Sequence, residues 1–132
     1  MTDLRQAAFD AYRAGDFAAA EAAYRRLLEQ NPADVDARMT LGVVLRRLGR
    51  LDEAITMLEG AVAAAPDDFK VFANLGLALQ TAKRLDEAIA AYRRAYRLEP
   101  RTIRQIAVNL SALGTGMLFL DPRRLEAFLA EG

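Results

Sequence analysis

Three stretches of this chain are near copies of one another: GDFAAAEAAYRRLLEQNP at residues 15–32, GRLDEAITMLEGAVAAAP at residues 49–66 and KRLDEAIAAYRRAYRLEP at residues 83–100. Corresponding positions lie 34 residues apart, and each stretch ends in proline. A strict period of this length is typical of stacked two-helix units, because one unit cannot bury its apolar side without a neighbour. Such a stack presents an extended surface, so the period predicts a protein that holds another polypeptide.

Apolar spacing predicts two helices in each unit. In the second unit Leu41, Leu45 and Leu48 share one side of a helix, and a second apolar stripe starts at Leu51 after a break at Gly49. The third unit repeats this pattern with residues that we expect in the core: Phe72, Leu75, Leu79, Leu85, Ile89, Tyr92 and Tyr96. No stretch alternates with the period of a strand, so we predict an all-α fold.

Composition excludes several classes of function. The chain has 132 residues, 18 basic and 18 acidic side chains, and neither cysteine nor histidine. Those absences remove disulfides, thiolate metal sites and the commonest general base, so we expect no catalytic residues, no enzyme activity, no metal and no cofactor. Balanced charge gives no overall attraction to nucleic acid, which is not an expected partner.

No targeting or membrane segment is evident. The start of the chain is charged and lacks the apolar run of a secretory peptide. The longest uncharged stretch, residues 105–120, contains amide side chains and glycines and falls short of the roughly 20 apolar residues that a membrane span requires. We therefore expect no membrane insertion and a cytoplasmic location.

The chain resembles the tetratricopeptide repeat family at positions that recur in register over about the first 100 residues. The small residues are Ala8, Gly42 and Gly76, then Ala20, Ala54 and Ala88; the bulky ones are Tyr24, Leu58 and Tyr92; the helix-ending prolines are Pro32, Pro66 and Pro100. The resemblance implies a right-handed α-solenoid of antiparallel helix pairs. Departures from the family pattern are Arg38 in place of an aromatic, Lys83 in place of a turn glycine, and Ala11.

The period divides the chain into segments of one domain. We expect repeats at residues 1–34, 35–68 and 69–102, a capping helix at residues 103–114, and an apolar tail with a short helix at residues 115–132. Gly114, Thr115 and Gly116 are interpreted as the end of the capping helix. Asp121 and Pro122 suit a helix start, and the helix after them has an apolar side formed by Leu125, Phe128 and Leu129.

The resemblance also implies a concave groove lined by the first helix of each unit. The groove residues that it assigns are Arg5, Phe9, Tyr12, Arg13, Met39, Thr40, Val43, Arg46, Arg47, Lys70, Asn74 and Leu77. Further inward positions include Asp36 and Gln80. Five of these side chains are basic and only Asp36 is acidic, so the groove is expected to take an acidic peptide segment with apolar anchors. The alternative interpretation is that the arginines only keep the surface soluble.

Some family members clamp a C-terminal carboxylate at five groove positions. The matching residues here are Arg5, Phe9, Thr40, Lys70 and Asn74. Only two of the five keep the charge, so that ligand is not expected.

Three hypotheses for function stay open at this point. The chain is a peptide-binding adaptor, or a scaffold that forms homo-oligomers through residues 115–132, or an adaptor whose own tail occupies its groove. The paired carboxylates at residues 52–53 and 86–87 fall in first turns of helices, where they complement the helix dipole, and are not candidates for acid–base catalysis.

Overall fold

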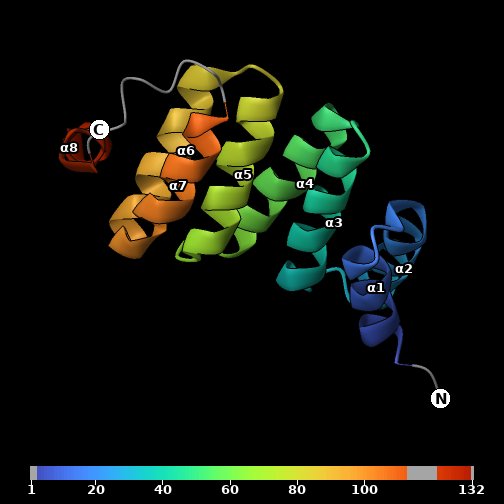
Figure 1. Ribbon diagram of the computed structural model, residues 1–132. Coiled ribbons are helices and arrows are strands. Elements are labelled where there is room, and N and C mark those ends of the chain that lie inside the picture. The colour runs from blue at the N-terminus through green and yellow to red at the C-terminus, as the bar shows by residue number, and fades with distance from the viewer. Residues whose placement is uncertain (1–2, 113–121, 132) are drawn as a thin grey trace. The chain divides into compact units, whose positions relative to one another are not determined.

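The computed structural model describes residues 3–112 and 122–131 (Figure 1). They fall into two compact units, unit 1 up to Pro66 and unit 2 from Asp67 onward. Both units consist of helices, and no strand occurs in the part of the chain that the structure describes. The prediction of an all-α fold is confirmed.

Unit 1 contains two antiparallel helix pairs, coloured blue to green in Figure 1. Its helices are α1 (Leu4–Arg13), α2 (Phe17–Gln30), α3 (Val35–Arg47) and α4 (Leu51–Ala64). The first three begin at aspartates, because the carboxylates of Asp3, Asp16 and Asp34 accept hydrogen bonds from backbone N–H groups of the first turn. The α1–α2 and α3–α4 turns pass through Gly15 and Gly49, whose φ angles of 79° and 81° favour glycine.

The core of unit 1 lies between these pairs. Its members are buried apolar side chains: Ala8, Ala20, Tyr24, Leu27, Ala37, Leu41, Val44, Leu45 and Ala54. Gly42 lets α3 and α4 approach closely, since a Cβ atom at this position would lie 2.6 Å from Cγ of Leu58. The family-like small and bulky positions are therefore direct packing partners.

Unit 2 contains a third helix pair and two further helices. Its elements are α5 (Phe69–Thr81), α6 (Leu85–Leu98), the 3-10 turn η1 (Pro100–Thr102), α7 (Ile103–Ser111) and α8 (Pro122–Glu131). Asp68 caps α5 by accepting from the backbone N–H of Lys70. A Cβ atom at Gly76 would lie 2.5 Å from the ring of Tyr92, which repeats the close approach seen in unit 1.

A buried series of hydrogen bonds connects α5, α6 and α7. The hydroxyl of Tyr92 donates to Oε1 of Gln80 at 2.7 Å, and Nε2 of Gln80 donates to the carbonyl of Asn109 at 2.6 Å. The predicted inward, groove-facing position of Gln80 is wrong, because this side chain is only 7% exposed. α7 covers it and supplies the acceptor that a buried amide requires.

α8 packs against α6 and α7 of its own chain. Leu125 and Leu129 are buried there, as the apolar side of the predicted helix requires. The predicted helix end at residues 114–116 and the apolar run 117–120 lie outside the described residues.

Three expected core residues are less buried than predicted, and one of them, Ile89, is half-buried. Leu85 is 42% exposed, because it is the first residue of α6 and lies at the end of the helix pair, where few neighbours can cover it. Tyr96 is half-buried. A tyrosine suits such a position, since it combines an apolar ring with a polar hydroxyl.

Candidate functional site

A pocket of about 280 Å³ lies in unit 1 between α1, α2 and α3. Its lining residues are Arg5, Gln6, Phe9, Tyr24, Asp36 and Thr40. Phe9 is 44% exposed, so part of its ring faces solvent beside this pocket. Three of the predicted groove residues, Arg5, Phe9 and Thr40, thus meet at one hollow.

Arg5 already has a partner within the unit. Its guanidinium forms an ion pair with Asp34, the N-cap of α3. The hydrogen bond to Asp34 raises the pKa of Arg5 further, and the charges of Asp34, Asp36 and Asp3 act in the same direction, against a smaller opposing effect of burial. Burial raises the pKa of Asp34, but the N–H of Ala37 and the Arg5 guanidinium outweigh it, so the net pKa is lowered. Arg5 therefore already has a carboxylate partner in its own unit, which the sequence does not reveal.

Two other arginines are stacked on aromatic rings. The guanidinium carbon of Arg13 lies 5.7 Å from the ring centroid of Phe9, and that of Arg47 lies 4.8 Å from the ring centroid of Phe17. Within the described residues neither arginine forms an ion pair with a carboxylate. A guanidinium held over a ring keeps its charge and its N–H donors, so both remain able to bind an acidic group.

The remaining predicted residues of unit 1 surround these groups. Tyr12 is half-buried and lies 6.2 Å, centroid to centroid, from Phe17. Met39, Thr40, Val43 and Arg46 of α3 are also half-buried. Burial raises the pKa of the Tyr24 phenol at the base of the pocket, with a smaller opposing effect from its hydrogen bond with Thr40. We call the nine predicted residues of this unit the α1–α3 face: Arg5, Phe9, Tyr12, Arg13, Met39, Thr40, Val43, Arg46 and Arg47.

The three predicted residues of unit 2 lie on α5. Lys70 is exposed, and Asn74 and Leu77 are half-buried. A second pocket of about 550 Å³ in this unit is lined mainly by residues that the sequence does not single out: Phe69, Glu99, Arg101, Thr102, Arg104 and Gln105. Glu99 and Arg101 form an ion pair at its edge. Lys70, Asn74 and Leu77 do not line this pocket.

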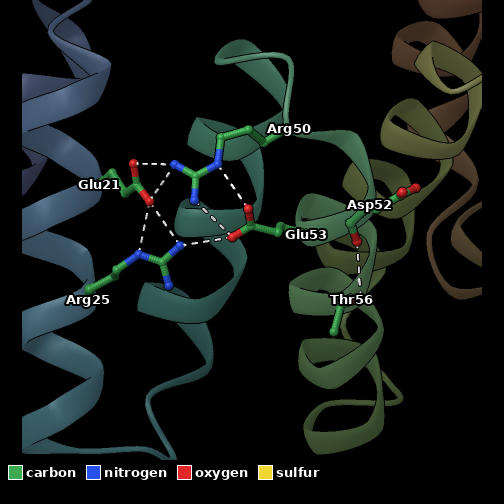
Figure 2. Close-up of polar contacts among 6 residues, drawn as sticks. All are labelled: Glu21, Arg25, Arg50, Asp52, Glu53 and Thr56. Carbon is green, nitrogen blue, oxygen red and sulfur yellow. Dashed lines mark hydrogen bonds and ion pairs between the residues drawn. The ribbon is translucent and has the colours of Figure 1, made fainter.

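Unit 1 contains a network of four charged side chains, two on α2 and two at the start of α4 (Figure 2). Arg50 pairs with Glu21 at 2.7 Å and with Glu53 at 2.9 Å, while Arg25 pairs with Glu21 at 2.9 Å and with Glu53 at 3.2 Å. Asp52 and Glu53 lie in the first turn of α4, as the helix-dipole interpretation requires. Glu53 therefore has ion-pair partners and belongs to a structural cluster.

The described part of the chain contains neither a metal-binding cluster nor a membrane-spanning helix. No group of acidic side chains there could hold a metal ion. Nor is any described helix long and apolar enough to cross a membrane.

A family model decides what the repeated helix pairs are. The model for the tetratricopeptide repeat matches residues 6–69 and 49–101, which together cover well over half of the chain. The chain belongs to the tetratricopeptide repeat family. This fold supports a protein–protein interaction module, and tetratricopeptide-repeat proteins are generally non-enzymatic adaptors.

Two proteins similar to this tetratricopeptide-repeat protein are much longer than it is. Cellulose synthase operon protein C of Komagataeibacter xylinus is 45% identical over 62 residues, which is 47% of this chain and 5% of that protein. A mutant O-GlcNAc transferase of Thermobaculum terrenum is similar with a TM-score of 0.77 and 28% identity, over 97% of this chain and 26% of the transferase. In both matches this chain spans much less than two thirds of the relative.

One similar structure is closer in length. The first tetratricopeptide repeat domain of Spaghetti (RPAP3), bound to an HSP90 peptide, is similar with a TM-score of 0.74 and 21% identity, over 84% of this chain and 90% of that domain. At this identity the likeness concerns the fold alone.

Proposed function

We propose that this protein is an adaptor that binds an extended or helical peptide segment of a partner protein on the α1–α3 face. The observation that carries the proposal is the pocket of about 280 Å³ beside Phe9. A partly exposed aromatic side chain next to a hollow suits an apolar anchor of a partner, because such contacts provide much of the energy of protein interfaces. The similar domain of Spaghetti (RPAP3), which holds an HSP90 peptide, supports this kind of ligand.

The proposal keeps an acidic group in the ligand but changes where it binds. Since Arg5 is engaged by Asp34, the arginines available to a carboxylate are Arg13 and Arg47. Lys70, Asn74 and Leu77 on α5 stay a prediction. The chain is proposed to bind without catalysis, and its cytoplasmic location also stays a prediction.

Self-assembly through residues 115–132 is the alternative. The burial of Leu125 and Leu129 against the same chain argues against it, because these two leucines are then not available to a second copy. The same packing argues against a tail in the groove, since α8 lies on α6 and α7. Light scattering of the full chain at micromolar concentration tests this point, and a mass at least twice that of one chain would favour the scaffold.

A peptide-binding measurement tests the adaptor. We expect a panel of fluorescein-labelled eight-residue peptides, each with one leucine or phenylalanine, to contain ligands detectable by anisotropy. Phe9→Ala should weaken the best ligand about five- to thirtyfold, the range expected for loss of one interface anchor. Val108→Ala is the matched control, because Val108 is 65% exposed but lies on α7. Equal affinity in Phe9→Ala and wild type would contradict the proposal.

A further inference from the structure

The α1–α3 face has opposite charge at its two ends, and this follows from how α1 and α3 are aligned. Arg5, near the start of α1, pairs with Asp34 at the start of α3. Arg47, at the end of α3, stacks on Phe17, which directly follows the turn that ends α1. The two helices therefore run in the same direction, with their N-termini together and their C-termini together.

The N-terminal end of this face is acidic. Asp3, Asp34 and Asp36 surround a single cation there, and the carboxylates of all three act on Arg5. Asp36 lines the pocket and is exposed, and within the described residues it forms no ion pair. One arginine against three carboxylates leaves a surplus of negative charge beside the pocket.

The C-terminal end of the face is basic. Arg13 lies in the last turn of α1, and Arg46 and Arg47 lie in the last turn of α3. The nearby carboxylate of Asp16 caps α2 by accepting from the N–H of Ala19. Asp10, one turn before Arg13 on α1, accepts from Nε2 of Gln6. Three arginines against two carboxylates leave positive charge in excess at this end.

We infer that the α1–α3 face binds a bipolar peptide, with a basic side chain at Asp36, an apolar side chain in the pocket beside Phe9 and an acidic side chain at Arg13 and Arg47. The inference rests on the proposed peptide-binding function and specifies its ligand. It replaces the acidic segment with apolar anchors that the count of basic residues suggests, because Arg5 is already paired with Asp34 at one end of the face. Complementary charge placement of this kind selects partners more than it adds affinity.

The geometry fixes the spacing of the charges. Asp36 and Arg47 are eleven positions apart on α3, which corresponds to about 16.5 Å at 1.5 Å per residue. An extended peptide covers this distance in about five residues at roughly 3.3 Å each. The ligand should therefore carry its basic and acidic side chains about five positions apart, with the apolar residue between them and nearer the basic one.

Three blocked peptides with the same apolar anchor test the inference. Each is acetylated and amidated and carries one leucine between two charged positions with the spacing given above. These two positions hold lysine and glutamate in the first peptide, two glutamates in the second and two lysines in the third. Fluorescence anisotropy at low salt should show the lysine–glutamate peptide binding about fivefold tighter than either of the others, the size expected for one exposed ion pair. Because a peptide can lie in a face in either direction, charge content is a sharper variable than sequence reversal.

Charge reversal in the protein should switch the preference. Asp36→Lys should make the two-glutamate peptide the best ligand, and Arg13→Glu with Arg47→Glu should make the two-lysine peptide the best. Arg26→Glu on the exposed side of α2 is the control and should leave the order unchanged. Urea midpoints of all variants separate a change of specificity from loss of folding.

The outcomes separate this inference from the function on which it depends. If all three peptides bind equally and lose affinity in Phe9→Ala, the adaptor function holds and the bipolar ligand is wrong. Preference of the wild-type protein for the two-glutamate peptide would also overturn the inference. If none of the three binds and the wider panel contains no ligand that depends on Phe9, the proposed function itself is wrong.

Discussion

Arg93 of α6 contacts Phe128 of α8 in two ways. Its Nε donates to the carbonyl oxygen of Phe128 at 3.1 Å, and its guanidinium carbon lies 4.6 Å from the centroid of the ring. Together with the buried Leu125 and Leu129, this pair of contacts places α8 on its own chain. The contacts lead to a direct test of how firmly α8 is held.

Arg93→Ala should loosen α8. The variant loses a hydrogen bond of about 1 kcal/mol and a cation–π contact of about 0.5 to 1 kcal/mol. Amide hydrogen exchange in residues 122–131 should become about tenfold faster, while exchange in α1–α4 stays unchanged. Arg97→Ala, an exposed arginine on the same helix, is the control. If α8 exchanges equally fast in both variants, Arg93 does not hold it.

Lys83→Gly should stabilise the protein. Lys83 has a φ angle of 63°, in the same turn position where Gly15 and Gly49 have φ angles of 79° and 81°. A left-handed backbone conformation costs a lysine about 1 to 2 kcal/mol, which Lys83→Gly removes. The greater conformational freedom of glycine in the unfolded chain offsets part of this gain in stability. We expect a net rise of about 0.5 to 1 kcal/mol in the free energy of unfolding, measured by urea denaturation.

The converse change is Gly49→Ala, which should destabilise the protein. No atom lies within 4 Å of a Cβ at this position, so the loss reports backbone conformation alone. A Gly49→Ala variant as stable as wild type would show that this turn tolerates a side chain and would remove the reason for the gain at Lys83.

Gly76→Ala should lower the free energy of unfolding by about 2 kcal/mol or more. A Cβ there would lie 2.5 Å from Cδ1 and Cε1 of Tyr92, which is fully buried and bonded to Gln80. Gly60→Ala is the matched control within a helix, because its nearest neighbour is the end of the Arg38 side chain, which can shift. Similar urea midpoints for the two variants would contradict the packing argument.

Acidification should weaken the charge network of unit 1. Burial raises the pKa of Glu21, but hydrogen bonds from Arg25 and Arg50 and their charges outweigh this effect, so its pKa is lowered from the ordinary value of 4.5. When folding lowers the pKa of a carboxyl group, the group stabilises the native state at every pH above its pKa in the unfolded chain. This contribution disappears as the pH falls through the pKa of the group in the native state.

Glu21→Gln measures that contribution. The variant should lose about 1 kcal/mol of stability at pH 7 and show a shallower decline between neutral and acidic pH than wild type. Urea midpoints measured from pH 7 down to pH 3 provide the comparison. Glu29→Gln, at an exposed end of α2, should reproduce the wild-type profile. An unchanged acid profile in Glu21→Gln would mean that the network does not stabilise the fold.

Much of the fold follows from local sequence signals. The aspartate caps, the turn glycines and the 34-residue spacing place each helix pair, because these features act within a few residues of the backbone that they shape. The small residue at Gly76 and the bulky residue at Tyr92 are also evident as partners, since both recur in every unit.

The candidate site was less predictable, because side-chain pairing depends on geometry between helices. The sequence counts Arg5 as a groove cation, but its partner Asp34 lies 29 positions away and is recognisable only once α1 and α3 are aligned. Gln80 has the periodic position of an inward residue, yet α7 covers it and offers the carbonyl of Asn109. Neither contact repeats along the chain, so periodicity could not reveal them.

A chain made of near-identical units risks pairing a helix with the wrong copy of its neighbour during folding. The charge network around Glu21 distinguishes the correct pairing of helices from an incorrect one, because it does not recur in the other units. One period later the residue corresponding to Glu21 is Ile55, and two periods later it is Ile89. Arg50 keeps Glu53 of its own helix in any pairing, but it finds its second carboxylate only on Glu21 and on neither of those isoleucines, so a misassembled junction lacks the ion pair that joins α2 to the start of α4.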